Sequence, residues 1–236
     1  MTKFIVITGA SKGIGRAAAD ALVEQGWSVI GVARSSPPSF PGVLIETDLT
    51  DQNHTRALAN DLAARGDVFG IVNNVGVARH ETIDAVEPGA FAAVMDLNVR
   101  PALQLTQALL PAMRAARFGR IINVTSLVTR GLAFRTSYAA AKAALESITR
   151  TMAIELAADG ITANAIAPGP TETELFRSNN PPGSEGEVRY LSRVPMKRFA
   201  QPSEIAAAIA FLAGEKAAFI TGQTLFVDGG ASLGTL

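Results

Sequence analysis

The chain has 236 residues, 48% of them apolar, which is enough for one large domain or two small ones. Its 21 basic side chains balance 21 acidic ones, so it has no net charge that would attract a polyanion or an anionic membrane. No nucleic-acid or membrane partner is therefore expected, and no apolar run approaches the ~20 residues that span a bilayer. The absence of cysteine excludes disulfides and thiol nucleophiles and fits a cytoplasmic location, and the two isolated histidines, His54 and His80, predict no metal site.

Strand-like and helix-like segments alternate along the whole chain. Short apolar runs predict strands at 4–8, 28–33, 43–47, 68–72, 120–125, 161–167 and 223–227. Longer helix-like segments are predicted at 16–25, 51–65, 88–117, 137–158 and 202–213. Because this alternation is typical of βαβ units, we expect an α/β fold: a doubly wound parallel sheet of Rossmann type, covered by helices on both faces, in a single domain over 1–236.

A late segment, 174–198, mixes proline, glycine, serine and charged residues. Loops in such a place often order over bound ligands and limit turnover. We interpret 174–198 as a substrate lid and expect its polar stretch, 178–186, to be mobile without ligand. The alternative is a passive surface loop.

A glycine-rich turn, Thr8-Gly-Ala-Ser-Lys-Gly-Ile-Gly15, follows the first predicted strand. Its glycines are spaced differently from the usual G-x-G-x-x-G, but they permit the same tight turn and close backbone approach. The helix that follows would present its N-terminal amides to a pyrophosphate. The turn therefore predicts nucleotide binding, although glycine turns between a strand and a helix also occur as purely structural elements.

Tyr138 and Lys142 stand four residues apart in an alanine-rich run with high helix propensity, so they share one helix face. A lysine cation close to a tyrosine favours the phenolate and lowers the tyrosine pKa from about 10 toward the range of a general acid or base. The pair thus predicts proton transfer. Taken alone, such a spacing more often describes a core tyrosine beside a surface lysine, since chance produces many such pairs.

Five motifs together resemble the short-chain dehydrogenase/reductase family, in order and approximate spacing: the glycine turn, Asn73-Asn-Val-Gly76, Ser126, Tyr138-x-x-x-Lys142 and Pro168-Gly169. The resemblance covers the whole chain, and within the family the sequence is similar to 3-oxoacyl-ACP reductases. It implies an NADP(H)-dependent oxidoreductase that interconverts a ketone and a secondary alcohol, with 3-oxoacyl thioesters as a candidate substrate class. A catalytically weak nucleotide-binding regulator of the same fold is the alternative.

The resemblance also implies catalytic roles. Tyr138 would protonate the carbonyl oxygen in reduction, and Lys142 would lower its pKa and hold the nicotinamide ribose. Ser126 would hydrogen-bond the substrate oxygen and the Tyr138 hydroxyl, although Thr125 competes for that role because the segment before Tyr138 is one residue short. Asn98 would anchor a water beside the lysine, or else mark a local break in the long helix.

The cofactor positions follow from the same resemblance. The glycine turn would hold the pyrophosphate, Asp48 and Leu49 the adenine, and the turn after the sixth strand the nicotinamide, while Asn73 is expected mainly to tie adjacent strands. The predicted set is Gly9, Ser11, Lys12, Gly13, Ile14, Gly15, Arg34, Asp48, Leu49, Asn74, Gly76, Tyr138, Lys142, Pro168, Gly169, Thr171 and Thr173, with no metal ligand.

The end of the second predicted strand favours NADP(H) over NAD(H). An NAD site typically has an acidic residue there, but this strand ends Gly31-Val-Ala-Arg-Ser-Ser36. Arg34 can grip a 2′-phosphate at two points, and Lys12 would add a second cation. If Arg34 is only a solvated loop residue, NAD(H) would bind equally well.

The helical segments 98–114 and 138–156 carry apolar residues on more than one face, such as Leu103, Leu105, Leu109 and Leu110. Such a helix must be buried more widely than one sheet contact allows. The resemblance implies a homotetramer or homodimer formed through these helices.

Overall fold

The structure is a computed structural model that describes residues 3–233. Seven strands form one parallel sheet in the order β3-β2-β1-β4-β5-β6-β7. They are β1 (Phe4–Thr8), β2 (Ser28–Ala33), β3 (Val43–Glu46), β4 (Val68–Asn73), β5 (Gly119–Val124), β6 (Ile161–Pro168) and β7 (Thr224–Val227). The predicted doubly wound α/β fold is confirmed.

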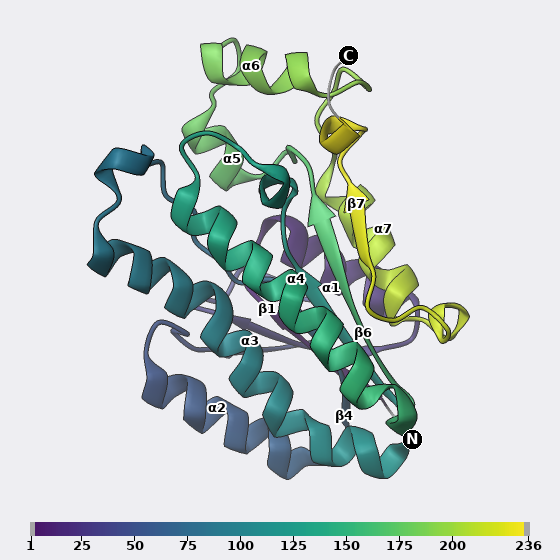
Figure 1. Cartoon of the computed structure of the whole chain (residues 1–236). Coiled ribbons are helices and arrows are strands. Elements are labelled where there is room, and N and C mark those ends of the chain that lie inside the picture. The colour runs from purple at the N-terminus through teal and green to yellow at the C-terminus, as the bar shows by residue number, and fades with distance from the viewer. Residues whose placement is uncertain (1–2, 234–236) are drawn as a thin grey trace.

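Helices cover both faces of this sheet (Figure 1). One face carries α2 (Gln52–Arg65), α3 (Pro88–Ala116) and α4 (Thr136–Leu156), and the other carries α1 (Gly13–Glu24) and α7 (Pro202–Ala213). Side chains alternate along a strand, so Ile5 and Ile7 pack toward α1 and α7 while Val6 packs toward α3. Short 3₁₀ helices are η1 (Ile83–Ala85), η2 (Leu127–Arg130), η3 (Ala157–Asp159), η4 (Glu215–Ala217) and η5 (Ala231–Leu233).

Two helices within the proposed lid were not expected from the sequence. They are α5 (Glu174–Asn179) and α6 (Glu185–Arg193). Each begins at a hydroxyl cap: Thr173 accepts a hydrogen bond from the Phe176 amide at 3.1 Å, and Ser184 accepts one from the Glu187 amide at 3.2 Å. The prediction missed α6 because the helix is only nine residues long and most of them are polar or charged.

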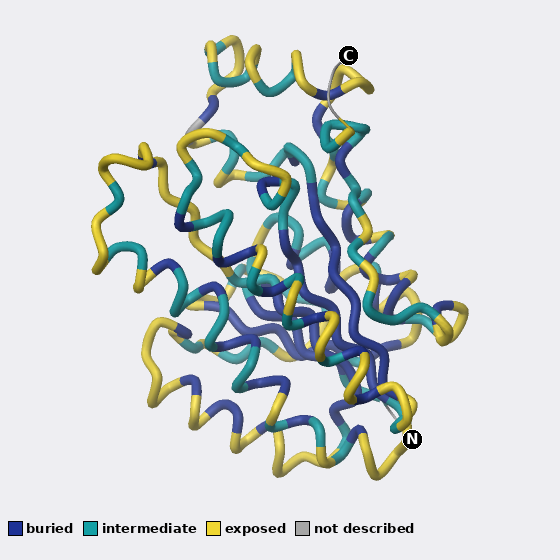
Figure 2. Tube along the Cα trace, in the orientation of Figure 1, coloured by how far each residue is buried: buried dark blue, intermediate teal, exposed yellow. Residues whose placement is uncertain are grey.

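A crevice forms at the point in the sheet where the order of successive strands reverses. β1 lies between β2 and β4, so the segments that follow β1 and β4 diverge at the carboxyl ends of these strands. Ligands of open α/β sheets bind in such a crevice. The helices of the proposed lid stand beyond the carboxyl end of β6, and they are far more exposed than the inner strands of the sheet (Figures 1 and 2).

No helix within residues 3–233 is both long and apolar enough to cross a membrane. The outermost residues of the predicted domain, 1–2 and 234–236, lie outside the described part of the chain.

Candidate active site

The glycine turn packs closely against its own helix. Gly9 and Gly13 have φ of 69° and 56°, a left-handed conformation that favours glycine. A Cβ on Gly15 would lie 2.3 Å from the Gly9 carbonyl oxygen, so that position excludes any side chain. The predicted turn is therefore present, and α1 begins at Gly13, three residues earlier than expected. Its N-terminal amides consequently lie within the predicted pyrophosphate motif.

Asn74 supports this turn from β4. Its side-chain nitrogen donates to the Thr8 carbonyl at 2.9 Å and to the Gly9 carbonyl at 3.2 Å. Asn74 therefore shapes the wall of the crevice through the backbone of the turn. The neighbouring Asn73 donates to Asn123 Oδ1 at 2.8 Å, which ties β4 to β5 as expected.

The adenine side of the crevice is ordered by an arginine that the sequence analysis overlooked. Arg100 donates to the Leu49 carbonyl at 2.9 Å and the Thr50 carbonyl at 3.2 Å, and pairs with Asp96 at 2.8 Å on its own helix. It thus clamps the predicted adenine loop onto α3. The only signal in the sequence was the four-residue spacing of Asp96 and Arg100.

Asp48, the residue predicted to meet the adenine amino group, is held in the same loop. One of its carboxylate oxygens accepts from the Thr50 amide at 3.0 Å and the Thr50 hydroxyl at 2.8 Å. These hydrogen bonds lower the pKa of Asp48, with a smaller contribution from the charge of Arg34. The carboxylate is thus ionised at neutral pH, and Arg34 is close enough to influence it.

The turn after β6 closes the other side of the crevice. A Cβ on Gly169 would lie 2.6 Å from Asp228 Cα, so tight packing at this point requires glycine. Thr171 donates to the Gly169 carbonyl at 2.9 Å, and Thr173 begins α5. A Cβ on Gly13 would lie 3.3 Å from Thr173 Cγ2, so the two predicted cofactor turns approach each other.

Lys12 lies on the glycine turn but is already paired. Its ammonium group contacts the Glu174 carboxylate at 2.9 Å, and both side chains are largely exposed. This ion pair joins the glycine turn to the first residue of α5. Ser11 and Ile14, the remaining predicted residues of the turn, flank Lys12 and Gly13 in the same segment.

Ser126 and Tyr138 are brought together by the end of β5 and the first turn of α4. The Ser126 hydroxyl lies near the Tyr138 side chain and acts to lower the Tyr138 pKa, and Ser126 also caps η2. Thr125 is engaged elsewhere, because its hydroxyl donates to the Ile166 carbonyl at 3.1 Å and ties β5 to β6. Of the two candidates, the geometry favours Ser126 as the partner of Tyr138.

The expected lowering of the Tyr138 pKa by Lys142 is wrong for the protein alone. Burial raises the Tyr138 pKa to about 12, outweighing the opposite effects of Ser126 and Arg135. Burial also lowers the Lys142 pKa to about 8. The Lys142 ammonium lies 5.7 Å from the Tyr138 ring centre and donates to the Val124 carbonyl at 2.9 Å. Desolvation therefore opposes the charged form of both groups.

Asn98 and Lys142 face one point beside Gly76. A Cβ on Gly76 would lie 2.6 Å from Asn98 Oδ1 and 3.1 Å from Lys142 Nζ. Asn98 Oδ1 is buried and has no hydrogen-bond partner, while its nitrogen donates to the Val94 and Val77 carbonyls. An acceptor and a donor thus converge on the crevice. The alternative of a helix break at Asn98 is wrong, since α3 continues through it.

These features fit a nicotinamide dinucleotide. The glycine cradle and the N-terminus of α1 suit a pyrophosphate, and Asn98 Oδ1 and Lys142 Nζ offer polar atoms to a ribose or a water at the far end.

Comparisons with known proteins agree with this site. The family profile described as enoyl-(acyl carrier protein) reductase matches residues 9–232. The chain is 39% identical over 240 residues to the 3-oxoacyl-[acyl-carrier-protein] reductase FabG of Vibrio harveyi, covering 97% of this chain and 96% of that protein. It is 36% identical over 238 residues to FabG of Escherichia coli K12, covering 97% of this chain and 96% of that protein.

Solved structures give the same result. A putative NAD(P)-dependent gluconate 5-dehydrogenase from Beutenbergia cavernae with bound NADP has a TM-score of 0.90 and 31% identity, covering 97% of this chain and 96% of that one. The chain belongs to the short-chain dehydrogenase/reductase family. Within that family it is an NAD(P)-dependent oxidoreductase, and its sequence is similar to 3-oxoacyl-ACP reductases.

Proposed function

We propose that the protein reduces the ketone of a 3-oxoacyl thioester to the secondary alcohol, with NADPH as the preferred reductant. The observation that carries this proposal is the convergence of Ser126, Tyr138, Lys142 and Asn98 on one crevice, in a chain similar to FabG reductases over nearly its full length. We further propose that residues 1–236 act as a single domain with a lid at 174–198, in the cytoplasm.

The raised pKa of Tyr138 suits a proton donor. With a pKa of about 12, its hydroxyl keeps its proton at neutral pH and can give it to a substrate oxygen that is gaining negative charge. Ser126 would donate a hydrogen bond to the same oxygen. When bound, the cofactor supplies the hydride, and the protein supplies orientation and the proton.

Lys142 and Asn98 complete the proposed proton path. Lys142, with a pKa of about 8, is mostly protonated at pH 7 and stabilises the phenolate that Tyr138 becomes. The carbonyl oxygen of the Asn98 side chain would hold a water beside Lys142, through which the lysine proton is replaced. The two groups would thus restore the Tyr138 hydroxyl after each turnover.

A substrate panel tests the reaction. Consumption of NADPH should be fastest with 3-oxoacyl thioesters of acyl carrier protein or coenzyme A, and slower with simple ketones that lack the thioester. Preference for a sugar or another polyol substrate would contradict the substrate class. Absence of turnover with every ketone and alcohol, despite cofactor binding, would instead favour a nucleotide-binding regulator.

Cofactor preference is proposed to rest on Arg34. Arg34 follows β2 directly and is exposed, while Lys12 is engaged by Glu174, so Arg34 is the cation more available to a 2′-phosphate. We expect kcat/KM to be higher with NADPH than with NADH, and Arg34→Asp to lower that ratio by about tenfold or more. A wild-type preference for NADH, or a ratio unchanged by the substitution, would show that Arg34 does not select the cofactor.

A homotetramer or homodimer is proposed as the assembly. Ile154 on α4 is 82% exposed, and Phe219 and Leu225 leave further apolar surface around η4 and the edge strand β7. Edge strands and exposed apolar surface are commonly covered by a partner. Light scattering should give a mass above that of one chain at micromolar concentration, and a monomer mass would refute the proposal.

A further inference from the structure

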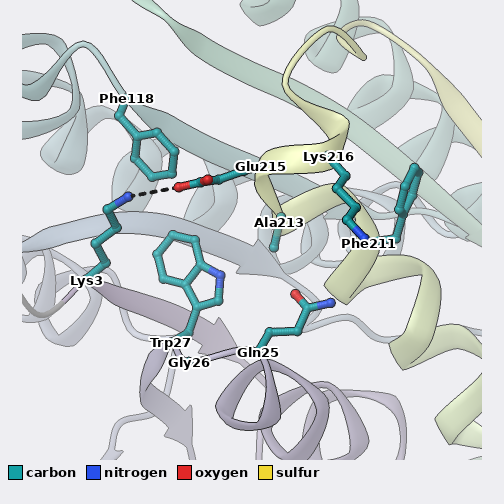
Figure 3. A pocket seen from close by; sticks show the side chains of 10 residues that line it. Lys3, Gln25, Gly26, Trp27, Phe118, Phe211, Ala213, Glu215 and Lys216 are labelled. Atoms are coloured by element: carbon teal, nitrogen blue, oxygen red, sulfur yellow. Dashed lines mark ion pairs between the residues drawn. The ribbon is translucent and has the colours of Figure 1, made fainter.

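A cavity of about 960 Å³ lies at the opposite end of the sheet from the catalytic groups. Three of its lining residues stand just before strands: Lys3 before β1, Trp27 before β2 and Phe118 before β5. The rest of the wall comes from the end of α1, the end of α7 and η4 (Figure 3). The cavity thus lies at the N-terminal edge of the sheet and is open to solvent.

Aromatic rings form two walls of this cavity. Trp27 and Phe118 stack on one side, with ring centres 6.2 Å apart and planes 27° from parallel, and Phe211 stands on the other (Figure 3). The indole nitrogen of Trp27 and the side-chain amide of Gln25 turn toward the space between these walls. Trp27 is only 9% exposed, so Phe118 and Phe211 supply most of the flat apolar surface of the cavity, together with a few hydrogen-bonding groups.

Positive charge gathers around the same cavity. The Lys3 ammonium lies 4.1 Å from the centre of the Phe118 ring, and the Arg120 guanidinium lies 4.4 Å from it. Lys216 stands beside Phe211 on the far wall. Among the lining residues the carboxylate is Glu215, which pairs with Lys3 at 3.7 Å. Two lysines thus face one carboxylate in the lining, and Arg120 adds a third cation against the Phe118 ring.

Arg120 is the unusual member of this group. It is 3% exposed, and its Nε is buried without a hydrogen-bond partner, while one terminal nitrogen donates to the Gly119 carbonyl at 2.8 Å. Burial lowers its pKa, and the charge of Glu215 partly offsets this. Arg120 does not line the cavity, but it lies directly against Phe118. A buried guanidinium with an unpaired donor is costly, so an anion nearby would stabilise it.

We propose that this cavity binds an amphipathic organic anion, with a flat apolar body between Trp27 and Phe211 and its acidic group facing Lys3 and Lys216. The aromatic walls would bury the body, and the lysines would form charge-assisted hydrogen bonds with the acid. The site is separate from the catalytic crevice and does not rest on the proposed reaction. A second copy of the chain is the competing occupant, because Phe211 is exposed here.

Trp27 makes this proposal directly measurable, since it is the single tryptophan of the chain. The probe is 1-anilinonaphthalene-8-sulfonate, an aromatic anion, titrated in the presence of saturating NADP⁺ so that the crevice is occupied. Energy transfer from Trp27 to the dye should be saturable. The uncharged analogue N-phenyl-1-naphthylamine should bind about tenfold more weakly, because it lacks the acid.

Paired variants separate charge at the cavity from charge elsewhere. The double variant Lys3→Met, Lys216→Met should weaken dye binding by about tenfold or more. The control Arg56→Met, Arg150→Met removes two cations from exposed positions on α2 and α4 and should leave binding unchanged. Light scattering on the same samples reports whether either pair alters the assembly.

Three outcomes would overturn the proposal. Equal affinity for the dye and its uncharged analogue would reveal an apolar hollow without anion selectivity. Dye binding without energy transfer from Trp27 would place the dye elsewhere. Dye binding that appears only when an oligomer dissociates would show that the cavity wall is a contact between copies of the chain.

Discussion

The floor of the catalytic crevice and the proposed lid beside it, residues 174–198, are held by different kinds of interaction. On the floor, Lys142 and Asn98 are 2% exposed, and both donate to backbone carbonyls of neighbouring segments. In the lid, α6 has no buried residue, and Arg177 of α5 connects the two helices by pairing with Glu172 and Glu187. Hydrogen bonds to the backbone therefore hold the side chains of the floor in position, whereas contacts between side chains hold the two helices of the proposed lid together.

This difference separates chemistry from access. Burial sets the pKa values on the floor, so substitutions there should change the rate of proton transfer. The lid depends on charge pairs and on Phe176, whose ring contacts those of Tyr190 and Phe199 with centres 5.3 and 4.8 Å apart. Substitutions in the lid should therefore change substrate affinity and local opening more than the chemical step.

The largest effect is expected at the proton donor. Tyr138→Phe removes the hydroxyl and keeps the ring, so the fold and cofactor binding should persist while kcat falls by about 10²–10⁴-fold. Steady-state kinetics and a cofactor titration measure the two properties. Turnover close to that of the wild type would remove Tyr138 from the mechanism.

Lys142→Met should lower both kcat and cofactor affinity, and it should also change the pH dependence of stability. The folded-state pKa of about 8 lies below the ordinary lysine pKa of 10.5, so the charged lysine destabilises the fold below pH 8, and this penalty fades as the pH rises toward 10.5. The variant should therefore be more stable than the wild type at pH 7, by up to about 3 kcal/mol, and lose this advantage by pH 10.

Denaturant unfolding at the two pH values measures this difference. An equal difference in unfolding free energy at pH 7 and pH 10 would show that the buried charge carries no penalty. The lost hydrogen bond to the Val124 carbonyl would lower the stability of the variant at both pH values alike, so the pH trend isolates the charge.

Arg177→Met is expected to act on the lid alone. Loss of both carboxylate contacts should speed hydrogen exchange across α5 and α6 and raise KM by roughly three- to tenfold, with a smaller change in kcat. The control is Arg114→Met, which breaks the Arg114–Asp159 pair far from the lid. Unchanged exchange in the lid would mean that its aromatic contacts suffice to hold it.

Glu174→Gln should have the smallest effect. Its pair with Lys12 is exposed, and such pairs contribute little to stability. Its loss would release Lys12 toward a 2′-phosphate and raise the kcat/KM ratio of NADPH over NADH by about twofold. A lowered ratio would indicate instead that the ion pair positions the glycine turn for the cofactor.

The sequence predicted the fold well because its signals are local. Each strand is a short apolar run, and each covering helix is a longer segment that contains both apolar and polar residues. The alternation and the glycine turn could therefore be recognised without knowing any tertiary contact. The prediction failed at α5 and α6, where polar residues obscure the helices. Arg100 was missed because its partners, Leu49 and Thr50, lie about fifty residues away in the chain.

The sequence by itself thus determined the doubly wound sheet and the family, and it predicted which groups would act in the crevice. The tertiary structure decided their charge states, because desolvation depends on what surrounds a group in space, and it reversed the expected direction of the Tyr138 pKa. It also decided the pairing of Lys12 with Glu174, 162 residues away, and the cavity that joins Lys3, Trp27 and Phe118 at the far edge of the sheet. Such contacts follow from the packing of distant segments, which no local pattern encodes.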